Sequence, residues 1–288
     1  MSITLENVPH PERPLRVATV QSPVVAGDVD SNAERAAELI REASAGGARL
    51  VLFAEKFLSG YEPELISSDP VKHAVQPGDP RLEPIARACR EGGAAAVVGT
   101  AFRTEEGELR ISALVFGVDG EIVTRYDKQY LFTSESAYYR PGHAGCSIEL
   151  DGWRLGLGIC YDSGFAEHAR AAALDGCHAY LVGALFSPEN GHHESRIWFP
   201  ARAFDNGVYA VLANHVGSTG GWNTCGASAV WGPDGRLVAE AGADRREVLI
   251  ADLDPEVLRA ARLKETMVAD LAAAGRPDAA GRGRHLLA

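Results

Sequence analysis

The stretch Ser112-Ala-Leu-Val-Phe-Gly-Val-Asp-Gly-Glu-Ile-Val-Thr124 decides the fold, because its pattern occurs again later in the chain. Two apolar runs flank the dipeptide Asp119-Gly120, which is typical of a tight β-hairpin turn. The stretch Ala227-Ser-Ala-Val-Trp-Gly-Pro-Asp-Gly-Arg-Leu-Val-Ala239 repeats this order of apolar strand, Asp-Gly turn and apolar strand. We therefore expect two similar halves, each of which ends in a pair of strands.

The segments that precede each hairpin support the same division. In the first half, apolar runs and N-cap residues predict strands at residues 15–21, 49–54 and 95–102, helices at residues 30–46 and 81–91, and hairpin strands at residues 111–118 and 121–126. In the second half, they predict strands at residues 153–159, 178–183 and 208–214, and helices at residues 165–174 and 193–206. This order predicts an α/β fold, a four-layer α-β-β-α sandwich with pseudo-symmetric halves and the functional site between its two sheets.

The composition is that of a globular protein, with 46% hydrophobic and 23% charged residues among 288. The net charge of −11 argues against a nucleic-acid partner, and no apolar run approaches the ~18 residues of a membrane span. We see no signal-peptide core and no CxxC pair among the five cysteines, so we expect a cytoplasmic protein. We divide the chain into an N-terminal extension (residues 1–14), one domain (residues 15–253), and a C-terminal helix (residues 255–262) with an Arg-, Gly- and Ala-rich tail within residues 254–288.

Cys160 stands at the end of the apolar run 153–159, directly before an expected helix. A thiol at such a strand-to-helix turn lies near a helix N-terminus, whose free N–H groups and partial positive charge favour the thiolate. The alternative is a buried structural cysteine, which is the more common role of a free cysteine. Charged residues at the ends of other strands favour the reactive interpretation.

Those charged residues are Glu55, Lys128 and Glu135. Glu55 follows the expected strand 49–54, Lys128 follows the first hairpin, and Glu135 comes seven residues later. A carboxylate that ends a buried strand is costly to bury without a partner, and strand ends in α/β sheets often face a site. A thiol nucleophile needs a base and a donor for the oxyanion, which glutamate and lysine can supply. Each residue alone is typical of a surface charge, but together with Cys160 they predict a nucleophilic site.

At these residues the chain resembles the nitrilase, or carbon-nitrogen hydrolase, superfamily, and its amidase-like branch in particular. The resemblance extends from about residue 16 to about residue 253. It rests on the segments Phe53-Ala-Glu-Lys-Phe-Leu-Ser-Gly-Tyr61, Tyr126-Asp-Lys-Gln-Tyr-Leu-Phe132 with Glu135 and Arg140-Pro-Gly142, Gly158-Ile-Cys-Tyr-Asp162, Ala201-Arg-Ala203 with Asn206, Asn214-His-Val-Gly217, and Gly226-Ala-Ser228.

The resemblance implies an α-β-β-α sandwich and a role for each candidate residue. It implies that Cys160 is the nucleophile and that Glu55 is the general base. It also implies that Lys128 stabilises the tetrahedral intermediate, and that Glu135 positions Lys128 or helps to transfer the proton. The backbone N–H of Tyr161 would be the second oxyanion donor. No metal and no organic cofactor is expected.

Two departures from the family pattern stand beside the catalytic segments. Ala54 occupies a position where the family usually has proline, which concerns backbone rigidity more than chemistry. Gly164 occupies a position where many relatives carry an arginine that grips a substrate carboxylate, so we expect a pocket for a neutral amide. The expected substrate-binding residues are Tyr61, Phe132, Ala184 and Phe186. A preference for charged substrates would require another arginine, such as Arg140, Arg196 or Arg202.

We expect an amidohydrolase that cleaves a small, neutral, non-peptide amide through a cysteine thioester and releases ammonia or an amine. The nearest alternative is an N-carbamoyl amine hydrolase, followed by a nitrilase, an amide-forming acyltransferase, and a non-catalytic assembly or redox protein. A papain-like pair of Cys160 with His215 and a metal site at His192-His193-Glu194 are less favoured, because the papain signature is missing and adjacent helical side chains diverge. The expected partners are the amide substrate and further copies of the chain, in a homodimer or higher homo-oligomer, with neither nucleic acid nor membrane.

Overall fold

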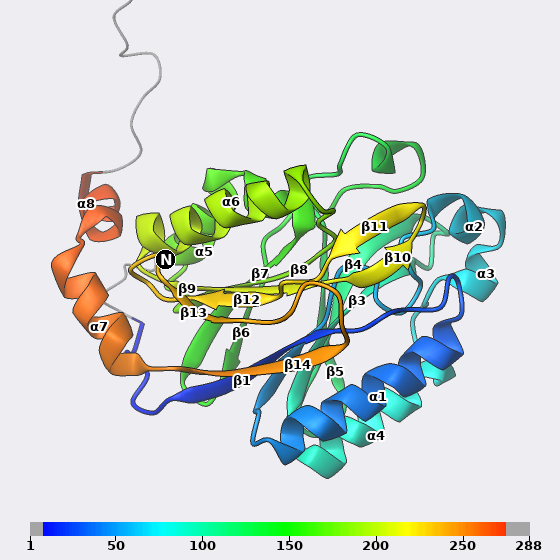
Figure 1. Cartoon of the computed structure of the whole chain (residues 1–288), viewed down its shortest axis with the longest axis horizontal. Coiled ribbons are helices and arrows are strands. Elements are labelled where there is room, and N and C mark those ends of the chain that lie inside the picture. The colour runs from blue at the N-terminus through cyan, green and yellow to red at the C-terminus, as the bar shows by residue number, and fades with distance from the viewer. Residues whose placement is uncertain (1–7, 275–288) are drawn as a thin grey trace, which may run out of the picture.

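Two six-stranded sheets form the centre of the computed structural model, which describes residues 8–274 (Figure 1). The first sheet contains β1 Leu15–Gln21, β2 Leu50–Leu52, β3 Ala95–Arg103, β4 Leu109–Phe116, β5 Ile122–Asp127 and β14 Glu247–Leu253. The second sheet contains β6 Ser147–Leu150, β7 Trp153–Ile159, β8 Ala179–Ala184, β9 Tyr209–Asn214, β12 Ala229–Trp231 and β13 Leu237–Glu240. The strand orders are β14-β1-β2-β3-β4-β5 and β13-β12-β9-β8-β7-β6.

The two halves follow one topology, which confirms the predicted pseudo-symmetry. Each half has three neighbouring parallel strands, β1-β2-β3 in the first sheet and β7-β8-β9 in the second. Each continues into an antiparallel hairpin, β4-β5 or β12-β13, at the two stretches that share the Asp-Gly turn. A further antiparallel strand lies on the opposite edge, β14 beside β1 and β6 beside β7. These two edge strands were not among the predicted elements.

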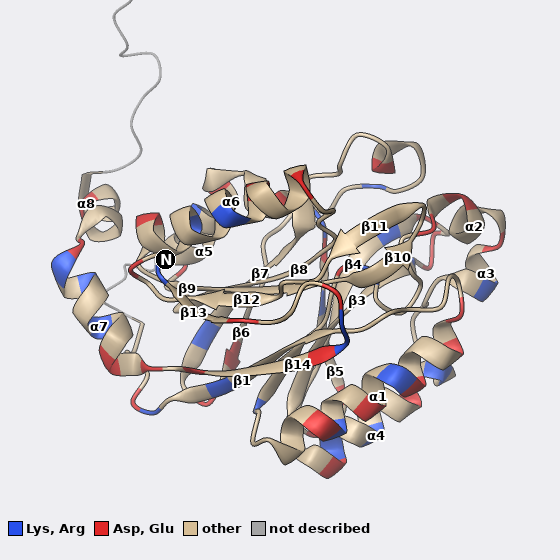
Figure 2. Cartoon of the chain, in the orientation of Figure 1, with Lys and Arg blue, Asp and Glu red and all other residues tan. Residues whose placement is uncertain are grey.

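Helices cover the outer face of each sheet and complete the predicted four layers (Figure 1). The helices α1 Val29–Ala45 and α4 Glu83–Gly92 lie on the first sheet, and α5 Ala166–Leu174 and α6 Asn190–Asn206 lie on the second. Side chains alternate along the strands, so that Val17 in β1 faces the second sheet while Ala18 packs in the cluster that contains α1. Charged residues gather on the helices and loops, whereas the strands are largely uncharged (Figure 2).

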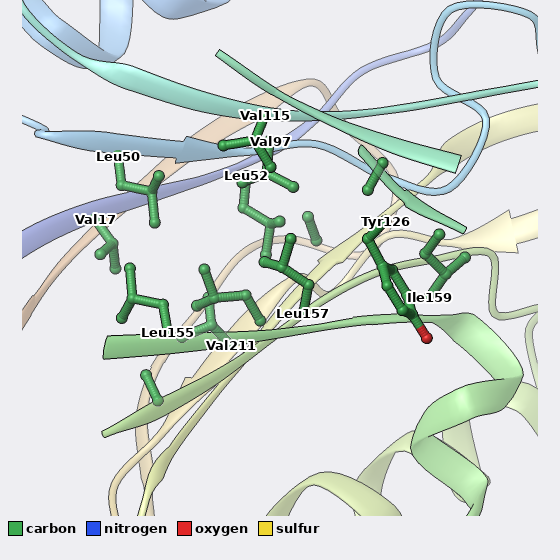
Figure 3. Close-up of a cluster of buried hydrophobic side chains, with 14 of the residues drawn as sticks. Val17, Leu50, Leu52, Val97, Val115, Tyr126, Leu155, Leu157, Ile159 and Val211 are labelled. Atoms are coloured by element: carbon green, nitrogen blue, oxygen red, sulfur yellow. The ribbon is translucent and has the colours of Figure 1, made fainter. Parts of the chain in front are cut away.

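Apolar side chains from both sheets fill the space between them (Figure 3). In β7, large residues alternate with glycines, and Leu155, Leu157 and Ile159 face the first sheet. Gly156 lies on the opposite side of the strand, toward the helices. A Cβ there would lie 2.7 Å from the side chain of Ala172 in α5. β7 therefore contributes large side chains to the central core on one side, and Gly156 lets α5 pack close to the strand on the other side. The labelled members of this core are Val17, Leu50, Leu52, Val97, Val115, Tyr126, Leu155, Leu157, Ile159 and Val211.

Several short elements join the sheets or follow them. The helices α2 Pro63–Ser68 and α3 Pro70–His73 and the hairpin β10 Val216–Thr219 with β11 Trp222–Cys225 were not predicted. The predicted C-terminal helix is α7 Pro255–Lys264, and α8 Met267–Ala274 follows it. The remainder of the predicted tail, residues 275–288, and the first seven residues of the predicted extension lie outside the described residues. None of the helices between residues 8 and 274 is long and apolar enough to cross a membrane.

Gly99 in β3 and Gly183 in β8 hold the segment that follows β2 between the two sheets. A Cβ on Gly99 would lie 2.2 Å from the carbonyl oxygen of Ala54, and a Cβ on Gly183 would lie 2.4 Å from the carbonyl oxygen of Phe53. Both atoms belong to the backbone, which cannot rotate away as a side chain can. Residues 53–55 are therefore fixed by one strand of each sheet.

We expect the substitution Gly183→Ala to lower the free energy of unfolding by about 1–3 kcal/mol, the usual cost of overpacking a close-packed interior. Gly145→Ala is the matched control, because a Cβ at Gly145 would meet no atom within 4 Å. Urea unfolding followed by circular dichroism measures both values. Equal stabilities of the two variants would contradict the close approach of β8 to residues 53–55.

Candidate active site

A buried network of three ionisable side chains lies where three predicted segments meet. The Nζ of Lys128 donates to Oε1 of Glu55 at 2.7 Å, and to both carboxylate oxygens of Glu135 at 3.0 and 2.8 Å. The side chains are at most 1% exposed. Glu55 follows β2, Lys128 follows β5, and Glu135 begins a short 3₁₀ turn, Glu135–Ala137. The structure thus brings together three residues that are far apart or on different elements in the sequence.

The electrostatics of the network keep Lys128 charged. Burial opposes ionisation of Lys128, but the charges of Glu55 and Glu135 outweigh it and raise the pKa above the usual lysine value. For Glu135, burial is likewise outweighed by Lys128 and by hydrogen bonds, so its pKa lies below the usual value. Burial dominates at Glu55 and raises its pKa. The two glutamates are therefore unequal: Glu135 is a fixed anion, and Glu55 is the carboxylate with the greater affinity for a proton.

Cys160 lies at a sharp turn after β7, as predicted, and the turn is held in an uncommon backbone conformation. Its φ is +45°, a left-handed value that few residues other than glycine adopt. Cys160 opens the 3₁₀ turn Cys160–Gly164, and Ser163 donates a hydrogen bond to its carbonyl oxygen at 2.6 Å. Asp162 accepts from the N–H of Ile159 at 3.0 Å and from the hydroxyl of Tyr126 at 2.7 Å. These bonds fix the direction in which the thiol points.

The resting state of Cys160 is a neutral thiol, and the expected stabilisation of the thiolate by a helix N-terminus is wrong for this state. Burial and the charge of Glu55 raise the pKa of the thiol, and the lowering effect of Lys128 is smaller. The helix α5 begins only at Ala166, after the 3₁₀ turn. The sulfur lies 3.7 Å from the carbonyl oxygen of Leu185, to which the thiol can donate. The residue Cys160 as a whole is partly exposed.

Two residues without a predicted supporting role hold the site. His215 follows β9, and its Nε2 lies 2.6 Å from the backbone carbonyl oxygen of Glu55, to which it donates. The ring of His215 thus holds the backbone of Glu55 in place. This contact accounts for the histidine in the segment Asn214–Gly217 better than a papain-like pair with Cys160 does. Asp162 anchors the cysteine turn to β5 through Tyr126. Each residue lies within a family segment, and that position was its signal in the sequence.

The predicted substrate-binding residues fall into two groups. Tyr61 donates to Oε1 of Glu135 at 2.5 Å, and the backbone N–H of Phe132 donates to Oε2 at 2.7 Å, so both lie at the network. The ring of Phe132 meets that of Tyr161 edge to face, at 5.4 Å between centroids. Ala184 and Phe186 instead belong to the core between the second sheet and its helices. Their contact with substrate stays a prediction.

The surroundings of Gly164 leave little space for a larger side chain. A Cβ there would lie 3.2 Å from the ring of Trp198 in α6. Arg202 donates to the carbonyl oxygens of Ser163 and Gly164 at 3.0 and 2.8 Å. Arg196 bonds to Glu240 and to the carbonyl oxygen of Ala227. Two of the three arginines considered as replacement carboxylate clamps are thus engaged in holding the fold.

The chain is similar to known sequences along most of its length. The pattern of the carbon-nitrogen hydrolase family matches residues 16–263. The "Hydrolase in pqqF 5′region" of Pseudomonas protegens is 32% identical over 259 residues, which cover 89% of this chain and 88% of the relative. The omega-amidase NIT2 of Homo sapiens is 30% identical over 249 residues, which cover 83% of this chain and 88% of the relative.

Solved structures extend the similarity to three dimensions. A mutant of the amidase from Nesterenkonia sp. AN1 in complex with butyramide is similar with a TM-score of 0.77 and 29% identity, covering 90% of this chain and 97% of the amidase. Another structure of that amidase shows the Michael addition of acrylamide at the active-site cysteine, with a TM-score of 0.76 and 29% identity over 87% of this chain and 97% of the amidase. Because the family pattern covers most of the chain and the fold agrees, the protein belongs to the carbon-nitrogen hydrolase family of the nitrilase superfamily.

Proposed function

We propose that this carbon-nitrogen hydrolase is an amidase that uses Cys160 as its nucleophile and acts on small, neutral, linear amides. The observation that carries the proposal is the buried Glu55–Lys128–Glu135 network beside a thiol on a strained turn. An unused structural cysteine would need neither a buried cation nor two buried carboxylates, which are costly to keep in a protein interior.

The first half of the reaction forms a thioester. Oε2 of Glu55 is buried and has no hydrogen-bond partner among the described residues, so it is free to accept the thiol proton. As the proton moves to Glu55, the sulfur attacks the amide carbonyl carbon and the carbonyl oxygen becomes an oxyanion. Lys128 and the backbone N–H of Tyr161 stabilise this oxyanion, by about 3–4 kcal/mol for each donor. Glu55 then gives its proton to the leaving nitrogen, the C–N bond breaks, and ammonia or an amine departs.

The second half returns the enzyme to its resting state. Water gives a proton to Glu55 as its oxygen attacks the thioester carbonyl carbon, and the same donors hold the new oxyanion. Collapse of this intermediate breaks the C–S bond, and the proton on Glu55 returns to the sulfur. Glu135 stays ionised throughout and keeps Lys128 oriented through two hydrogen bonds. All steps use groups of the chain, the amide and water.

The neutral substrate is supported by the packing around Gly164 and by one relative. Trp198 takes the space beside Gly164, and Arg202 is engaged with backbone oxygens. The Nesterenkonia amidase, which is similar over most of the chain, is described in complex with butyramide, an uncharged amide. Hydrolysis of an N-carbamoyl amine on the same residues is the second candidate, since its carbonyl carbon accepts the same attack.

The reaction itself is tested by Lys128→Ala. We expect kcat for ammonia release from butyramide to fall about 10²–10³-fold, because a fixed donor to the oxyanion is lost. The melting temperature should fall as well, since two buried carboxylates lose their cation, so turnover is assayed well below it. Cys160→Ala should show no turnover, and mass spectrometry of the wild type quenched in acid should show an acyl group on Cys160. Near-normal turnover in either folded variant would refute the assignment.

The substrate class is tested by comparing kcat/KM for butyramide and for succinamate, a monoamide of similar length that carries a carboxylate. We expect butyramide to be preferred by at least ~30-fold, because a carboxylate placed in a pocket without a donor loses its hydration. A preference for succinamate would show that another cation grips the acid. Arg140→Ala would then be the first variant to measure, since Arg140 is exposed.

A further inference from the structure

Lys56 is a second buried lysine beside the network, and the reaction described above does not use it. Its side chain belongs to the fully buried set, and its Nζ has no hydrogen-bond partner among the described residues. The chain contains four lysines and 24 arginines, so the surface cations are mostly arginines while two of the four lysines lie inside the site. A buried cation without an acceptor is costly, and this residue therefore needs an explanation.

The surroundings of Lys56 place its charge close to the reacting groups. Its Nζ lies 3.3 Å from the ring centroid of Tyr61 and 4.8 Å from that of Tyr139. The ring faces stabilise a cation there without binding it by hydrogen bonds. The hydroxyl of Tyr61 in turn bonds to Glu135, so the ring that contacts Lys56 also touches the network.

The backbone fixes the residue as firmly as its side chain does. Lys56 has a φ of +50°, and its N–H belongs to the segment that a Cβ on Gly99 would strike. The charged and titratable groups that face it are Glu55, Glu135, Lys128 and Cys160, together with His215 and the two tyrosines.

The charges in this group balance only when Lys56 is counted. At rest, the anions Glu55 and Glu135 face the cations Lys128 and Lys56. After the thiol proton moves to Glu55, the anions are Glu135 and the sulfur or the substrate oxyanion. Every state of the proposed reaction thus carries two negative charges, and Lys128 alone supplies one positive charge. Without Lys56, the buried site would hold one uncompensated negative charge throughout.

We propose that Lys56, in its protonated form, is a positioning residue that balances the second negative charge of the site and thereby stabilises the thiolate and the oxyanion through space. This inference rests on the proposed function for its effect on turnover, but its effect on the thiol does not need a substrate. Burial lowers the pKa of Lys56 to about 8, against the opposing charges of Glu55 and Glu135. The balancing charge is therefore present at neutral pH and lost as the pH rises through about 8.

The test compares the full-length wild type with Lys56→Met, which keeps the length of the side chain and removes its charge. The rate of iodoacetamide modification of Cys160 and kcat for butyramide are measured from about pH 6 to about pH 10, around the expected loss of the charge. At neutral pH we expect both rates to be about 10–100-fold lower in the variant, from the loss of one charge at short range. The difference should shrink above pH 8, where the wild-type lysine is neutral as well.

Matched controls separate the charge from other effects. Lys264→Met makes the same substitution at an exposed lysine in α7 and should leave both rates unchanged. Cys146 is the other partly exposed thiol among the described cysteines, and the rate of its modification should not respond to Lys56→Met. A second variant, Lys56→Arg, keeps a charge that does not titrate in this range. Its rates should therefore stay above those of Lys56→Met at every pH, including above pH 8.

The outcomes are distinct. A loss of rate in Lys56→Met that Lys56→Arg does not restore would mean that Lys56 acts through its shape and not through its charge, and no loss in Lys56→Met would mean that it has no role; either result overturns the proposal. A loss confined to KM for succinamate would make Lys56 a substrate clamp and overturn the positioning role. If neither variant folds, the test uses the wild type alone. The ratio of the Cys160 modification rate to the Cys146 modification rate must then fall as the pH rises above 8. Absence of amide hydrolysis with a normal effect on Cys160 modification would reject the proposed function and retain the role of Lys56.

Discussion

The contact between Lys128 and two buried carboxylates is the constraint on which the rest of the structure depends. None of these three groups can be buried alone at a tolerable cost in free energy, because each would lose its hydration without gaining a partner. Their contacts of 2.7–3.0 Å therefore require that the ends of β2 and β5 and the turn at Glu135 meet at one point. Gly99 and Gly183 make this possible, since any side chain on either would displace the backbone before Glu55.

The site joins the two halves of the fold. The network comes from the first sheet and its loops, whereas Cys160 follows β7 of the second sheet. Contacts between the halves set their alignment at this point: Tyr126 of β5 bonds to Asp162 in the cysteine turn, and His215 after β9 bonds to the backbone of Glu55. A shift of one sheet relative to the other would therefore separate the thiol from its base, so the packing of the core in Figure 3 also determines the geometry of the site.

The elements with strong local patterns were predictable. The hairpins at the two Asp-Gly turns, the parallel strands and the helices between them agree in order with the structure, and the family segments identified the residues of the network. The strands β6 and β14 were not predictable from local pattern, because each pairs as an edge strand whose residues are mostly not fully buried. The unused signal for Lys56 was its position directly after Glu55, where a second charge in an apolar segment is costly. The protonation of Cys160 could not be predicted either, since it depends on burial and on Glu55, which adjoin it only in three dimensions.

The pairing of β1 with β14 has a consequence for the order in which the chain assembles during synthesis. β1 leaves the ribosome before every other strand of the two sheets, yet its outer edge pairs with residues 247–253, from Leu15 opposite Leu253 to Gln21 opposite Glu247. The second sheet draws all its strands from one continuous part of the chain, residues 147–240, and can close before that. The first sheet must therefore wait with an open edge until residues 247–253 have emerged, and an unpaired strand edge of this kind is a site at which nascent chains aggregate. The pairing of β14 with β1 thus also ends the exposure of this strand edge to neighbouring chains.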